Sequence, residues 1–136
     1  MHIDIPELSV VLLIGPPEKR RRDFAQRFFK YEEVLKRSDF EESGFNSNYV
    51  DGIELLYEEV SKRLRDAEMT VIDTEVLDPD MARRMMSLAK KYHCALVGIV
   101  FGVPFLTQEE EKMSLEDFNQ MMQNQGIKRI YRIDSQ

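Results

Sequence analysis

Residues 8–24, LSVVLLIGPPEKRRRDF, have the layout of a phosphate-binding loop without the side chains that bind phosphate. An apolar run ends in Gly15, and a helix-compatible segment follows it. The P-loop motif G-x-x-x-x-G-K-[ST] uses a second glycine, a lysine and a hydroxyl to hold phosphates and Mg²⁺. Those three positions carry Arg20, Arg21 and Arg22. The frame of the motif is present, and its working side chains are replaced.

The residues between Gly15 and Arg20 also oppose nucleotide binding. Pro16 and Pro17 have no N–H group to donate to a phosphate. Glu18 brings a carboxylate close to the place of the phosphates, and a like charge at about 4 Å costs on the order of 4 kcal/mol at an effective dielectric near 20. The sequence therefore predicts that the chain has no cofactor, with Mg²⁺ and ATP expected only if kinase activity is retained.

Four consecutive cations, Lys19, Arg20, Arg21 and Arg22, form a basic run on a chain of net charge −6. Cations at a helix N-terminus oppose the helix dipole, and a bound anion would reverse that effect. Gly15 and the basic run are thus a candidate site for a phosphate, a small anion or a nucleic-acid end. The alternative is that the run is a solvated helix face.

Two aspartates are candidates for catalysis because each follows or ends a predicted strand. Asp39 comes after the second strand and Asp73 ends the third. Ligands of open α/β sheets bind at the carboxyl ends of the strands, where a carboxylate can accept a hydroxyl proton or orient a metal. Capping or turn roles are the alternative for both residues. His93 and Cys94 are too few to make a metal set, so no metal site is predicted.

The composition is that of an ordinary soluble globular domain. The chain has 136 residues, 43% of them hydrophobic and 32% charged, and we expect one domain over residues 1–136. No apolar run approaches the roughly 20 residues that cross a bilayer, so no membrane partner is expected. The N-terminal residues lack a signal-peptide layout, and a single cysteine fits a reducing compartment, which favours a cytoplasmic location.

Apolar β-branched runs alternate with amphipathic segments of helical length. We expect strands at 8–14, 33–36, 70–73, 95–101 and 128–133, and helices at 22–29, 49–66, 78–92 and 114–124. A strand–helix alternation of this kind gives a parallel sheet covered by helices. The predicted fold is a three-layer α/β/α domain with a parallel sheet of about five strands.

Four segments, considered together, resemble the kinase module of bacterial polynucleotide kinase–phosphatases, in the P-loop phosphotransferase superfamily. They are IPELSVVLLIG, RSDF, SKRLRDAEMTVID and LAKKYHCALVGIVF, and the resemblance runs from about Ile5 to Phe101 and again near Gly126 to Asp134. It implies a P-loop kinase-like fold. Kinases of that family transfer the γ-phosphate of ATP to a 5′-hydroxyl of DNA or RNA with Mg²⁺.

Carried over residue by residue, the resemblance implies an altered site. Asp39 matches the general base and Asp73 the strand-end aspartate that orients the metal. The arginine that the family places three residues after its base is Glu42 here, and PFLTQEEEK replaces an arginine-bearing lid with a shorter connection. The Thr-Asn after the strand-end aspartate has become Glu75-Val76.

The sequence leaves three hypotheses about function. The leading hypothesis is a catalytically inactive kinase-like domain that serves as a binding, regulatory or scaffold module for a partner protein, such as an active kinase relative. The second is an active ATP-dependent polynucleotide or nucleoside 5′-hydroxyl kinase, with Asp39 as general base and arginines in place of the P-loop lysine. The third is a non-catalytic anion or nucleic-acid-end binder that uses the basic run.

Overall fold

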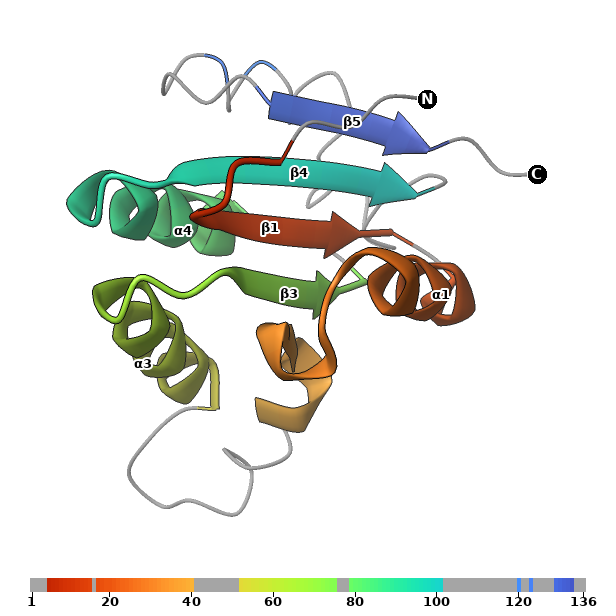
Figure 1. The fold of residues 1–136 in the computed structure, drawn as a ribbon, viewed down its shortest axis with the longest axis horizontal. Helices are drawn as coiled ribbons and strands as arrows, with labels where there is room; N and C mark the ends of the chain where they lie inside the picture. The colour runs from red at the N-terminus through yellow and green to blue at the C-terminus, as the bar shows by residue number, and fades with distance from the viewer. Residues whose placement is uncertain are drawn as a thin grey trace.

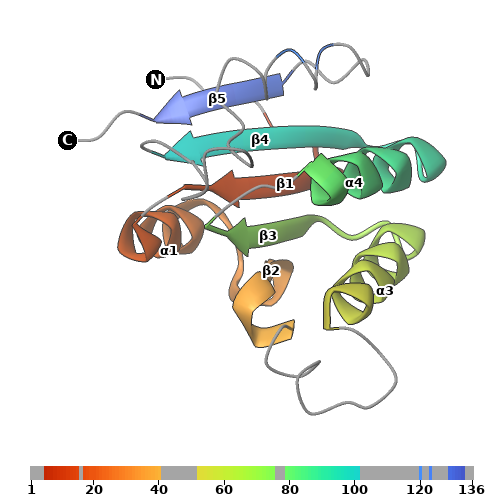
Figure 2. The same cartoon turned by 180° about the vertical axis from the view of Figure 1, so that it is seen from behind.

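Five parallel strands form the centre of the molecule in the order β2-β3-β1-β4-β5. The computed structural model describes residues 5–15, 17–40, 52–75, 79–101, 120, 123 and 129–133. The strands are β1 (Ser9–Ile14), β2 (Val34–Lys36), β3 (Thr70–Thr74), β4 (Ala95–Phe101) and β5 (Arg129–Ile133). The predicted α/β class and the parallel sheet of about five strands are confirmed, and Figure 1 shows β1, β3, β4 and β5 running in one direction. Figure 2 shows β2 beyond β3.

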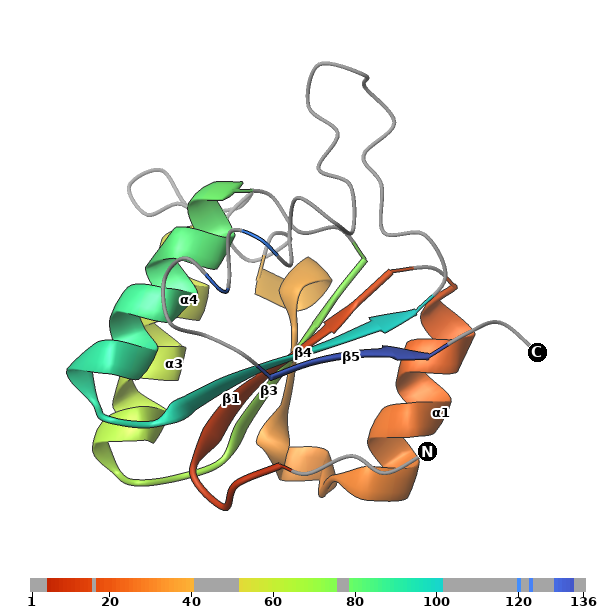
Figure 3. The same ribbon diagram turned by 90° about the horizontal axis from the view of Figure 1, so that it is seen from above.

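Helices cover both faces of the sheet. They are α1 (Glu18–Phe28), α3 (Gly52–Arg65) and α4 (Pro79–Lys91), with a short 3₁₀ turn, η1, at Tyr31–Glu33. Seen along the sheet in Figure 3, α1 lies on one face while α3 and α4 lie on the other. The three-layer arrangement predicted from the alternation of segments is therefore present.

The two sides of β1 pack against different helices because successive side chains of a strand point to opposite faces. Val10, Leu12 and Ile14 join the apolar cluster that contains residues of α3 and α4. Val11 and Leu13 join the cluster on the α1 side. All five are at most 1% exposed, as expected of a parallel sheet covered on both faces.

One boundary prediction was wrong. A helix was expected from Arg22, whereas α1 begins at Glu18, so the basic run lies inside the first turns of the helix. Pro17 takes the N-cap position, and Glu18 places a carboxylate in the first turn, where it favours the helix dipole. The observed bounds of the other described strands and helices differ from the predicted ones by a few residues at most.

Several predicted features lie outside the described residues. The helix expected at 114–124 lies outside them except for Gln120 and Gln123, which are helical. Glu42, Val76 and the segment PFLTQEEEK also lie outside them. Within the part of the chain that the structure describes, no helix is long and apolar enough to cross a membrane.

Candidate functional site

Gly15 follows β1 directly, in a conformation that only glycine adopts easily. Its φ is +106°, and a Cβ atom added there would lie 2.0 Å from the carbonyl oxygen of Phe101. Its N–H group donates a hydrogen bond of 2.9 Å to the carbonyl oxygen of Glu75. The glycine that opens the P-loop motif is thus used for close packing of the three strand ends.

The backbone that would wrap phosphate in a P-loop is wound into helix α1. The N–H groups of Arg20 and Arg21 donate to the carbonyl oxygen of Pro17, at 3.1 Å and 3.4 Å. A P-loop binds phosphate with backbone N–H groups that point into the loop. Here the donors at the second-glycine and lysine positions are used within the first turn of α1.

Arg21, at the position of the P-loop lysine, turns its side chain inward to Asp73. Its Nε donates to Oδ1 of Asp73 in a buried ion pair, and its Nη1 donates to the carbonyl oxygen of Gly15 at 2.6 Å. Both charged residues are 6% exposed. The structure therefore brings together three predicted site residues, Gly15, Arg21 and Asp73. Their polar groups are hydrogen-bonded to one another.

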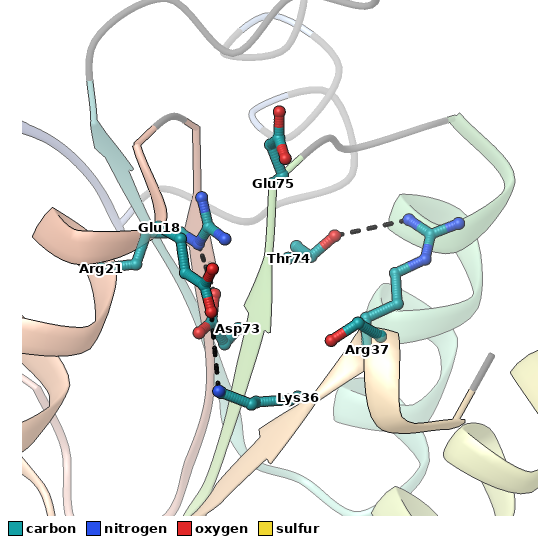
Figure 4. Close-up of a pocket in the computed structure, with 8 residues that line it drawn as sticks. Glu18, Arg21, Lys36, Arg37, Asp73, Thr74 and Glu75 are labelled. Carbon is teal, nitrogen blue, oxygen red and sulfur yellow. Dashed lines mark hydrogen bonds and ion pairs between the residues drawn. The ribbon is translucent and has the colours of Figure 1, made fainter. Parts of the chain in front are cut away.

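A polar cavity of about 390 Å³ lies at the carboxyl ends of β2 and β3, next to this ion pair. Figure 4 shows Glu18 and Lys36 reaching toward each other across it, with their charged atoms 3.6 Å apart. Both side chains are substantially exposed, so their attraction is screened by water. The cavity lies where an open α/β sheet binds its ligand, and three carboxylates, Glu18, Asp73 and Glu75, line it.

Arg37 and Thr74 are members of this cavity that the sequence did not single out. Nη1 of Arg37 donates to Oγ1 of Thr74 at 3.4 Å and also lies 3.4 Å from Sδ of Met81. Figure 4 shows the Arg37 guanidinium on the Thr74 side of the cavity, away from Arg21. The signal that could have identified these residues is their position at the carboxyl ends of β2 and β3.

The other cations of the basic run point to different surroundings. Lys19 makes an exposed ion pair of 2.9 Å with Asp23, and the guanidinium of Arg20 lies 5.8 Å from the ring centroid of Phe101. Arg22 is exposed and lines a second cavity, on the α1 face of the sheet. Successive helix positions are about 100° apart, so the four cations do not converge on one point.

Asp39 belongs to residues 37–40, a helical segment directly after β2, and its side chain is exposed. It does not line the cavity at the strand ends. It lines the second cavity, of about 530 Å³, together with Asp73 and Arg22. The two candidate catalytic aspartates therefore share a cavity wall, although only Asp73 contacts Arg21.

Two N–H donors and one carboxylate that would take part in nucleotide binding have partners within the chain. The N–H donors of Arg20 and Arg21 are used inside α1, and the Asp73 carboxylate is held by Arg21. Across the described ranges, no group of three or more His, Cys, Asp or Glu side chains could hold a metal ion.

Cys94 is half-buried, and its burial raises the pKa of the thiol.

Comparison with known proteins supports the fold and assigns no family. No family model matches the chain, and no curated protein matches it. A de novo designed P-loop fold protein, solved by solution NMR, aligns over 96% of this chain and 83% of its own with a TM-score of 0.61 and 14% identity. A crystal structure described as a "putative kinase" from Chloroflexus aurantiacus aligns over 70% of this chain with a TM-score of 0.52 and 14% identity.

The chain spans 58% of the length of the Chloroflexus protein. At 14% identity both likenesses concern the fold alone. They confirm that the fold is P-loop kinase-like. The closer relation to polynucleotide kinases stays a prediction.

Proposed function

We propose that this chain is a P-loop kinase-like domain without phosphotransferase activity, which acts as a binding, regulatory or scaffold module. The observation that carries the proposal is the side chain of Arg21. In place of a lysine directed at phosphates, a buried guanidinium bridges Asp73 and the Gly15 carbonyl group. The residues that would clamp the nucleotide and its metal are thereby bound to one another.

The state of the backbone supports the same proposal. A P-loop stabilises phosphates largely with preorganised N–H donors. Two of the donors expected here belong to the first turn of α1, where each has an acceptor on Pro17. Opening the loop for a nucleotide would require that turn to unwind and the Arg21–Asp73 pair to separate, both at a cost in stability.

The partner under this proposal is a protein, for instance an active kinase that the domain regulates or stabilises. A fold whose catalytic site has been lost still offers its surface for recognition. We expect a cytoplasmic location, in keeping with the single cysteine of the chain.

The alternative is an ATP-dependent polynucleotide or nucleoside 5′-hydroxyl kinase. The observation in its favour is that Asp39 and Asp73 line one cavity, to which Arg22 contributes a cation. Asp39 would then be the general base, and arginines would stabilise the transferred phosphoryl group.

A phosphotransfer assay separates the two functions. The protein is incubated with γ-labelled ATP, Mg²⁺ and a 5′-hydroxyl oligonucleotide, and Asp39→Asn is assayed in parallel. We expect no labelled oligonucleotide above the level of that variant. Transfer by the parent chain that Asp39→Asn abolishes would contradict the proposal and support the kinase.

A further inference from the structure

We draw no further inference here: the strongest candidate, the surface patch on helix α1 where the ring of Phe28 is 54% exposed beside the guanidinium of Arg27, carries none because nothing in the part of the chain that the structure describes shows what covers it.

Discussion

At the scale of single residues, Arg21, which stands where the P-loop motif has a lysine, decides the character of the strand-end site. A lysine extends toward a phosphate as a compact charge, whereas a guanidinium can bind several oxygen acceptors at once in a plane. Arg21 uses this property to hold the Asp73 carboxylate and the Gly15 carbonyl group together. The residue most suggestive of phosphate binding in the sequence is therefore a structural link between β1, α1 and β3.

The first prediction concerns this link. Replacing Arg21 with Met leaves the buried carboxylate of Asp73 without its counter-charge, and removing one member of a buried ion pair costs about 3–5 kcal/mol. Urea unfolding should show a loss of this size. Arg22→Met, at the exposed neighbouring position, should change the free energy of unfolding by less than about 0.5 kcal/mol.

The double variant Arg21→Met/Asp73→Leu provides the control for this prediction. It removes both charges, so it should be more stable than Arg21→Met alone. If Arg21→Met is as stable as the parent chain, Arg21 does not hold Asp73 in solution.

The second prediction concerns Gly15. Gly15→Ala should lower the free energy of unfolding by more than about 1 kcal/mol, because alanine fits poorly at positive φ and its Cβ would strike the Phe101 carbonyl group. Thermal unfolding measures the effect.

The inverse control for Gly15→Ala is Ala67→Gly. Ala67 is exposed and has φ of 58°, a conformation that costs a residue with a Cβ about 1–2 kcal/mol. This substitution should raise the unfolding temperature. A stabilising Gly15→Ala would show that the strand ends are packed less closely than the structure has them.

At the scale of elements, helices α3 and α4 are joined by one charged clamp. Arg84 donates to the Glu54 carboxylate from both terminal nitrogens of its guanidinium, with Nη2 at 3.0 Å from Oε1, and its Cζ lies 3.8 Å from the ring centroid of Tyr57. The hydrogen bond from Arg84 lowers the pKa of Glu54 below its usual value of 4.5. The clamp therefore stabilises the helix pair most when Glu54 is ionised.

The third prediction is the pH dependence of this clamp. Because the folded state lowers the pKa of Glu54, its contribution is present above pH 4.5 and is lost as the pH falls through the lowered value. Glu54→Gln should unfold at a lower temperature than the parent chain at pH 7, and the difference should shrink toward about pH 3. A difference that is constant over this range would mean that the charge of Glu54 is not responsible. Glu58→Gln, at an exposed position on the same helix, is the control.

The strands and helices could be predicted because each has a clear pattern of apolar residues. Val10 to Ile14 are apolar without interruption, as in a strand covered on both faces, and α3 repeats apolar residues at helical spacing. The start of α1 could not be predicted so well. A phosphate-binding loop was expected to extend to the basic run. The helix begins earlier because the Pro17 ring restricts its backbone φ angle and the Glu18 carboxylate favours the helix N-terminus.

At the scale of the whole molecule, the topology brings Gly15, Asp73 and the start of α1 to one edge of the sheet. That meeting follows from parallel strands in the order β2-β3-β1-β4-β5, and the sequence pattern predicts the strands, though not their order. What the sequence could not give is the direction of each side chain. The sequence left the four consecutive cations either as one anion site or as a solvated helix face. In the structure they separate into a buried pair, a ring contact and two exposed groups.

The fourth prediction follows from this separation and from the net charge of −6. Binding of a 5′-phosphorylated oligonucleotide should be undetectable at 150 mM salt, about physiological strength, because the four cations of the basic run do not converge to offset the repulsion of the chain. Fluorescence anisotropy measures it. Salt-dependent binding that is lost in Arg22→Ser and kept in Arg27→Ser would support an anion site at the basic run instead.

If the chain itself closes the position at which a P-loop holds phosphate, Mg-ATP should not bind there, and a titration followed by ¹⁵N chemical shifts measures this. We expect the amide signals of Gly15, Arg20, Arg21 and Glu75 not to move up to about 5 mM nucleotide, well above the micromolar to millimolar range usual for enzyme substrates. Saturable shifts at Gly15 and Arg21 below 1 mM, about the upper end of that range, would contradict it, since they would show that the Arg21–Asp73 link opens for a nucleotide.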